Sequence, residues 1–192
     1  MCGKSKHDAG ELAGGTVKKV TLLTEHLSTP IGTLFLFSEE DGTLRLADWE
    51  DLSERMNKLL IRHFGIDGLI NRASNQRSPS HEALEAYFDG DLNALANVRV
   101  KTSGTPYQIK VWEQLCLIPP GSTISYAELA RRVGNPASTR AVGAANGANF
   151  INIVVPCHRV IGSDASLTGY GSGLSRKRWL LDHENGAKPL FV

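Results

Sequence analysis

The chain changes its hydrophobic pattern near residue 99, and this switch is the feature that most constrains its fold. Before the switch, three runs rich in β-branched and aromatic residues predict strands, at residues 17–24, 33–37 and 43–49. The dipeptide Asp41-Gly42 is a tight-turn signal between the last two runs. After the switch the pattern becomes helical. A strand-rich unit followed by a helical unit is therefore predicted.

Two helices and a loop complete the first unit. Residues 51–64 place apolar side chains on one helical face, and residues 80–90 predict a shorter helix that ends at Gly90. The polar, proline-containing stretch 71–80 predicts a loop. We therefore expect three parts in the chain: a flexible polar tail at 1–16, an α/β domain at 17–98 and a helical domain at 99–192.

The second unit contains two short helices in close succession, after a longer predicted helix at residues 105–118. The segment "SYAEL" has the capping-box pattern of Ser125 and Glu128, and its helix is expected to end at Gly134. The segment "GNPAS" restarts a helix that is expected to run over residues 137–147. Two short helices around a glycine turn predict a helix-turn-helix.

The net charge of +1 conceals an uneven distribution. Residues 1–98 hold 10 Lys/Arg and 15 Asp/Glu, a net of −5, whereas residues 99–192 hold 11 and 5, a net of +6. A basic half indicates contact with an anion such as nucleic acid, although ordinary charge scatter explains the numbers equally well.

The second short helix favours the nucleic-acid explanation. Its residues are mostly small, among them Ala137, Ala141 and Gly143, and Arg140 is its only charge. Small residues suit either tight helix packing or close approach to a DNA groove. One arginine projecting from a smooth helix, within a basic half, favours DNA.

The cysteines bear on compartment and cofactors. The chain has 3 cysteines without CxxC spacing, which argues against a disulfide framework and a zinc cluster. We therefore expect a reducing compartment, cytoplasmic or, in a eukaryote, nuclear, and no metal site. No apolar window approaches the length of a membrane span, and the N-terminus lacks the apolar core of a signal peptide.

The segment "NIVVPCHRVIG", residues 152–162, carries the candidate chemistry. The thiolate of Cys157 would be the nucleophile, but His158 is its neighbour and the two side chains diverge in an extended segment. A water molecule between them would allow His158 to act as base, with a carboxylate to orient its ring. Glu184 in "WLLDHEN" is the best candidate for that carboxylate. Cys116, among apolar residues of a predicted helix, is typical of a buried, inert thiol.

Together, "SYAELA", "TRAVGAANGAN", "IVVPCHRVIG" and "TGYGSG…RKRWLLDHE" resemble the O6-alkylguanine-DNA alkyltransferase (methylated-DNA–protein-cysteine methyltransferase) family, in its constitutive bacterial type. The resemblance covers about residues 18–186 and is strongest from Gly104 onward. It implies an N-terminal ribonuclease-H-like α+β domain and a mainly helical C-terminal domain with a winged helix-turn-helix. It also implies direct-reversal repair of double-stranded DNA: irreversible, stoichiometric alkyl transfer from O6-alkylguanine, and less readily from O4-alkylthymine, to the active cysteine without a cofactor.

The resemblance also implies residue roles. Cys157 accepts the alkyl group, His158 is the base through water, Glu184 orients it, Tyr126 protonates the leaving purine, and Asn149 joins the active-site turn to the DNA helix. Arg140 enters the base stack in place of the flipped nucleotide, and the helix lies in the minor groove. The other DNA-binding positions are Ser125, Tyr126, Ala137, Thr139, Ala141 and Gly143. The substrate pocket comprises Val160, Asn152, Val155, Tyr170 and Gly171. The backbone carbonyls of Cys157 and Val160 accept the guanine amino group.

Some features depart from the family pattern. Phe150 stands where many members have proline. Asn152 occupies a variable position in the pocket wall, and the sequence leaves open how this polar residue affects the size of alkyl group that the pocket accepts. Two alternative functions also remain: a cysteine hydrolase that uses Cys157, His158 and Glu184, and a non-catalytic alkyl-base sensor, which the presence of Cys157 disfavours. We expect a monomer with no membrane partner, and leave cooperative binding along DNA open.

Overall fold

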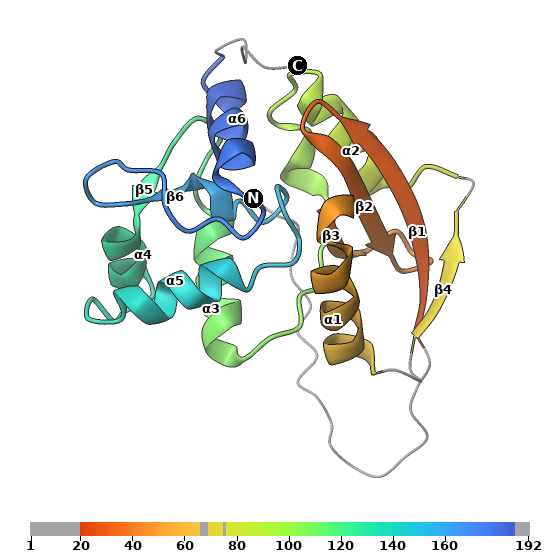
Figure 1. The fold of residues 1–192 in the computed structure, drawn as a ribbon, viewed down its shortest axis with the longest axis horizontal. Coiled ribbons are helices and arrows are strands. Elements are labelled where there is room, and N and C mark those ends of the chain that lie inside the picture. Colours follow the sequence, from red (N-terminus) through yellow and green to blue (C-terminus); the bar gives the residue numbers. More distant parts are fainter. Residues whose placement is uncertain (1–19, 66–68, 75, 187–192) are drawn as a thin grey trace.

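The computed structural model describes residues 20–65, 69–74 and 76–186, and places a sheet beside a group of helices (Figure 1). In chain order the elements are β1 (Val20–Thr29), β2 (Gly32–Ser38), β3 (Leu44–Trp49), η1 (Glu50–Leu52), α1 (Ser53–Phe64), β4 (Leu69–Ala73), α2 (Pro79–Phe88), η2 (Ala94–Asn97), α3 (Pro106–Cys116), β5 (Ile124–Ser125), α4 (Tyr126–Arg132), α5 (Thr139–Gly147), η3 (Cys157–Arg159), β6 (Val160–Ile161) and α6 (Leu174–Glu184). The predicted tail, residues 1–16, lies outside the described residues.

The four-stranded sheet has the order β3-β2-β1-β4. The first three strands form an antiparallel meander, and the predicted turn between β2 and β3 is confirmed, with Gly42 at a φ of 80°. β4 runs parallel to β1, which is the ribonuclease-H-like order that the resemblance implies. The prediction of a loop at 71–80 was therefore wrong at its start. Pairing with β1 supplies the hydrogen bonds of β4, and its side chains from Asn71 to Ala73 stay exposed at the sheet edge, so its polar sequence gave no strand signal.

The predicted helices of the first half are confirmed. α1 buries Met56 and Leu60 against the sheet and exposes Glu54, Lys58 and Arg62. α2 has Ser78 as its N-cap, whose hydroxyl accepts from the backbone N–H of His81, and Pro79 in its first turn.

The second half contains the predicted helix-turn-helix, formed by α4 and α5. Ser125 caps α4 by accepting from the backbone N–H of Glu128. The expected capping box is only half formed, because the Glu128 carboxylate pairs with Arg131 and Arg132 instead. β5 and β6 form a two-stranded parallel sheet in contact with α4, where the resemblance implies a wing.

The start of α5 corrects the predicted range 137–147. The helix begins at Thr139, and residues 135–138 form a turn. The carbonyl of Asn135 accepts from both the backbone N–H and the hydroxyl of Ser138. Ser138 lies outside the helical region at a φ of −92° and a ψ of 24°, so Ala137 lies just before α5.

The outer edge of β3 joins the two halves. The backbone N–H of Ala47 donates to Phe150, and that of Asn152 donates to Ala47, each at 2.9 Å. Residues 150–152 therefore extend the sheet edge, and all six residues of β3 are buried. The division at residues 98 and 99 stays a prediction. Among the described residues, no helix is long and apolar enough to cross a membrane.

Candidate active site

Cys157 begins the short helix η3 at the centre of the molecule, and only 4% of it is exposed. The side-chain amide of Asn149 donates to its Sγ at 3.0 Å and to the carbonyl of Val155 at 2.9 Å. The side-chain oxygen of Asn149, Oδ1, in turn accepts from the backbone N–H of Ile151. Asn149 therefore holds both ends of the turn that leads into the cysteine.

This turn contains an unusual backbone conformation. Ile153 has a φ of 71°, a region that β-branched residues rarely adopt. The turn is closed by hydrogen bonds from Val154 to Asn152 and from Val155 to Ile151. Backbone strain of this kind persists only where the surroundings enforce it, and here the edge of β3 and the Asn149 amide do so.

Behind Cys157 lies a buried network that centres on the carboxylate of Glu184. His158 is fully buried, and its Nε2 lies 2.8 Å from Glu184 Oε1. Arg159 donates from Nε to Oε2 at 2.9 Å and from Nη2 to Oε1 at 2.8 Å. The hydroxyl of Tyr87 donates to Oε1 at 2.8 Å, and the backbone N–H of Gly121 donates to Oε2 at 3.1 Å.

The network sets the protonation of its members. Burial opposes ionisation of Glu184, but the hydrogen bonds and charges of His158 and Arg159 outweigh it and hold the pKa of this carboxyl well below its usual range. Burial lowers the pKa of His158, against the opposing effect of Glu184, so the imidazole is neutral at pH 7. Burial raises the pKa of the Cys157 thiol, and the Asn149 hydrogen bond offsets part of this rise. The site therefore holds a neutral thiol beside a neutral imidazole.

Tyr126 is the first residue of α4, which is the first helix of the helix-turn-helix. Its hydroxyl donates to the carbonyl of Gly169 at 3.0 Å, and its ring lies 3.9 Å from a Cβ built on Gly143. Gly169 has a φ of 60°, and a Cβ there would lie 2.7 Å from the Tyr126 oxygen, so this glycine leaves room for the hydroxyl, whereas 3.9 Å at Gly143 is an ordinary contact distance. Burial raises the pKa of Tyr126, which keeps its hydroxyl protonated.

The predicted DNA-binding residues lie on and beside α5. Thr139, Arg140 and Ala141 are exposed, whereas Gly143 turns toward Tyr126. Ala137 is exposed in the preceding turn. Ser125 caps α4 with its hydroxyl, so its side chain already has a partner within the protein.

Several of the predicted pocket residues already have polar partners within the protein. Val155 and Tyr170 are buried. The amide of Asn152 donates to the Asp48 carboxylate at 2.9 Å and to the Ala47 carbonyl at 3.0 Å, so its side chain is held against β3. The carbonyl of Val160 accepts from the Lys177 ammonium at 2.5 Å, and that of Cys157 accepts from Asn146 at 3.3 Å. The carbonyl of Cys157 also accepts from the backbone N–H of Val160, so both of its lone pairs already have partners within the protein.

Several residues of the site were absent from the sequence prediction, Asn146 and Gly121 among them. Arg159 and Tyr87 bind Glu184, Lys177 binds the carbonyl of Val160, and Nη2 of Arg55 donates to the carbonyl of Asn149 at 2.8 Å. The position of Arg159 beside His158 was an available signal. Tyr87 and Arg55 come from the first half of the chain, and no local pattern marks them.

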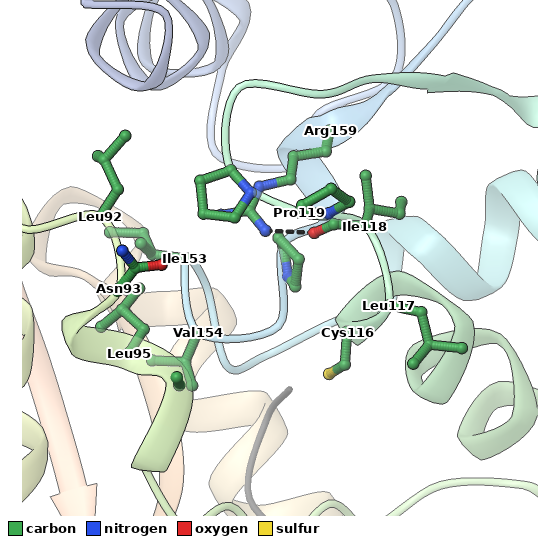
Figure 2. Close-up of a pocket in the computed structure, with 13 residues that line it drawn as sticks. Leu92, Asn93, Leu95, Cys116, Leu117, Ile118, Pro119, Ile153, Val154 and Arg159 are labelled. Atoms are coloured by element: carbon green, nitrogen blue, oxygen red, sulfur yellow. Dashed lines mark hydrogen bonds between the residues drawn. The ribbon is translucent and has the colours of Figure 1, made fainter.

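A cavity of about 390 Å³ lies beside Arg159, between η2 and the loop after α3 (Figure 2). Nη1 of Arg159 donates to the carbonyl of Ile118 at 2.5 Å in its wall. Cys116 also lines this cavity and is half-buried, so the prediction of a buried thiol was wrong. In the last turn of α3, Cys116 faces this cavity, whereas its neighbour Leu115 is fully buried in the core.

The fold and the site together define a helix-turn-helix protein with a buried, cysteine-centred site. Residues 106–186 match the family model described as 6-O-methylguanine DNA methyltransferase, DNA binding domain. The methylated-DNA–protein-cysteine methyltransferase of Shigella flexneri is 44% identical over 163 residues, which cover 85% of this chain and 95% of that protein. The protein of the same description from Methanosarcina mazei is 42% identical over 163 residues, 84% of this chain and 97% of that protein.

The crystal structure of Mycobacterium tuberculosis OGT in complex with DNA is similar throughout. It matches with a TM-score of 0.70 and 36% identity, over 89% of this chain and 96% of that chain. The chain belongs to the methylated-DNA–protein-cysteine methyltransferase family. The resemblance and the fold class predicted from the sequence are therefore confirmed.

Proposed function

We propose that this protein repairs DNA by moving an alkyl group from the O6 atom of guanine to Sγ of Cys157, once per molecule. Membership of the family supports the reaction class. The single observation that carries the assignment to Cys157 is its buried thiol, which accepts a hydrogen bond from Asn149 beside the His158–Glu184 pair.

The protonation states support His158 as the base that removes the thiol proton. An ionised carboxylate can only accept, so the Nε2 atom that lies against Glu184 carries the ring proton. The lone pair of His158 is therefore on Nδ1, which has no hydrogen-bond partner among the described residues. A neutral imidazole with a free, buried lone pair is suited to take a proton through one water molecule.

The transfer is a displacement at a saturated carbon. The thiol proton moves through water to Nδ1 of His158, and the Sγ electron pair forms the bond to the alkyl carbon. The bond between that carbon and O6 breaks, and its electrons stay with guanine. The Tyr126 hydroxyl gives its proton to the purine, so guanine leaves neutral, and the imidazolium returns a proton to the tyrosinate through solvent. The thioether has no second nucleophile beside it, so the protein is consumed.

The contact with double-stranded DNA is proposed to use α5 in the minor groove. The exposed face of this helix consists of small residues around Arg140, which suits close approach to a groove. The target base must leave the stack to reach a buried thiol, and Arg140 is placed to refill the gap. We propose that the protein does this as a monomer.

Intact-mass measurement tests the reaction. The protein is mixed with a duplex oligonucleotide that contains one O6-methylguanine, and we expect a gain of one methyl group and a plateau at one repaired lesion per molecule. Cys157→Ser should show no gain, whereas Cys116→Ser, a matched change at the other described thiol, should react normally. Methylation of Cys157→Ser, or repeated turnover by the unmodified protein, would overturn the proposal.

A further inference from the structure

Tyr87 contributes a hydroxyl to the catalytic network from a distant part of the chain. It lies on α2, 97 residues before Glu184, and is fully buried. Its hydroxyl donates to Glu184 Oε1, the same oxygen that accepts from His158. Burial, followed by the charge of Glu184, raises the pKa of Tyr87 far above its usual value, so this group remains a donor at every working pH.

The ring of Tyr87 is fixed by the helix that carries Glu184. His183 of α6 lies against it with ring centroids 5.2 Å apart, and Nε2 of His183 donates to the Tyr87 carbonyl at 2.7 Å. Phe88 packs edge-on at 5.5 Å. The ring and the backbone of Tyr87 both contact His183 of α6. The Tyr87 hydroxyl is therefore fixed in position at the Glu184 carboxylate.

We propose that Tyr87 is a positioning residue of the alkyl-transfer site, which holds Glu184 Oε1 in line with His158 and shares the negative charge of that oxygen. The inference rests on the proposed role of His158 and Glu184. It means that the sheet half of the protein takes part in the chemistry, although the cysteine and the DNA-binding helix both belong to the other half.

The hydrogen bond has a consequence for the proton affinity of His158. Each donor to Oε1 withdraws charge from it, so removal of the Tyr87 hydroxyl leaves more charge to stabilise a protonated His158. The pKa of His158 should therefore rise. The other groups that act on His158 are Arg159 beside it and Lys177 of α6, and those that act on Tyr87 include Arg159 and Tyr170. A change of the hydroxyl alone leaves all of them in place.

The test is Tyr87→Phe, which removes the hydroxyl and keeps the ring. The rate of Cys157 alkylation by free O6-benzylguanine, which needs no base flipping, is measured by intact mass from about pH 5 to about pH 9. We expect the acid limb of the profile to move up by about half to one pH unit, which makes the reaction roughly three- to tenfold slower at the acid end. The alkaline plateau should stay within about twofold of the unmodified protein, because His158 is neutral there in both.

Tyr107→Phe is the matched control, because it removes a hydroxyl that donates to Ser138 Oγ at 2.9 Å and lies outside this network. Its profile should match that of the unmodified protein. NMR titration of the His158 ring gives a second measurement, in which Tyr87→Phe should titrate at higher pH. An unshifted profile and unshifted titration would overturn the inference and show that Tyr87 only packs. Failure of the unmodified protein to gain mass at Cys157 would instead defeat the proposed function.

Discussion

The proposed reaction would use two regions with opposite physical designs, the network around Glu184 and the exposed face of α5. In the network, the carboxylate accepts hydrogen bonds from His158, Arg159 and Tyr87, and all of these side chains are buried. On α5, small residues surround Arg140, and no side chain caps the helix at Ser138. The helix is held from its inner face, by residues that include Val142 and Ala145.

The difference follows from what each region must do. Proton transfer needs fixed atoms in a low-dielectric setting, which burial and multiple donors provide. Contact with DNA needs a smooth surface that can approach a groove, and a helix with few outward partners provides it. Changes in the network should therefore affect folding and chemistry together, whereas changes on the α5 face should affect only reactions that involve duplex DNA.

The largest effect is expected from Glu184→Ala. The substitution leaves Arg159 buried without its carboxylate, a change that typically costs about 3–5 kcal/mol. For a chain of this size the melting temperature should fall by roughly 6–20 °C. Thermal unfolding measures it, with Glu128→Ala as control, since that carboxylate forms comparable arginine pairs at the surface of α4. Equal losses in the two variants would contradict the comparison.

The pH dependence of stability also tests the contribution of the Glu184 carboxylate, with Glu184→Gln, which keeps the shape of the side chain and removes its charge. The pKa of Glu184 lies below its unfolded value of about 4.3, so its stabilising effect is present above that pH and is lost as pH falls through the folded pKa. Glu184→Gln lacks this contribution at every pH. The gap in melting temperature between the two proteins should therefore narrow below about pH 4, and a gap that widens there would refute the assignment.

Alkylation of Cys157 should give the next largest effect. The thiol is buried and lies 3.0 Å from the Asn149 amide, so a covalent alkyl group must displace this amide and the turn that it holds. Overpacking of this kind costs about 1–3 kcal/mol. We expect a drop in melting temperature of several degrees after methyl transfer and a larger drop after benzyl transfer.

Differential scanning fluorimetry measures this drop on free and fully alkylated protein. Cys157→Ser exposed to the same reagent controls for direct effects of the reagent on stability. A midpoint that is unchanged or raised by both groups would mean that the pocket absorbs the product without displacing Asn149.

Arg140→Ala should produce a smaller effect, confined to DNA. If Arg140 refills the base stack, its loss should slow repair of duplex O6-methylguanine by about tenfold, roughly 1.4 kcal/mol. The reaction with free O6-benzylguanine should keep its rate, because no base is flipped. Arg77→Ala removes one exposed charge on the sheet half and is the control. Equal slowing on both substrates would show that Arg140 supports the fold of α5 instead.

The two regions also differ in how far the sequence predicted them. Ser125 and Gly42 act within a few residues, so the helix-turn-helix and the hairpin could be predicted from local signals. The segment around Cys157, with Glu184 chosen as the orienting carboxylate, predicted the three residues of the relay, and the structure brings His158 and Glu184 together. Where each side chain acts locally or within a motif, sequence reasoning was sufficient.

Partners set by tertiary packing were not predicted. Tyr87 reaches Glu184 across 97 residues, and Arg55 reaches Asn149 across 94. Their local sequence is that of an ordinary amphipathic helix, so nothing near them indicates a role. β4 was missed for the same reason, because its hydrogen bonds come from β1 rather than from its own pattern. The start of α5 was misplaced because the Ser138 turn competes locally with a helix.

The smallest expected effect is on the salt dependence of DNA affinity, and it distinguishes two ways in which Arg140 could contact DNA. Affinity for duplex DNA should fall with salt concentration, with a slope that increases by about 0.9 for each phosphate that the protein neutralises. The slope should be modest, because α5 is short and Arg140 is its single charged residue. An arginine inserted into the base stack neutralises no phosphate fully, so Arg140→Ala should weaken binding while the slope changes by less than about half a unit. A surface arginine that binds a phosphate would instead remove about one unit from the slope. Fluorescence anisotropy with a labelled duplex at a series of salt concentrations measures both quantities. A full unit of change would assign Arg140 to the DNA backbone, and the exposed face of α5 would then act as an electrostatic contact surface rather than as the site of base replacement.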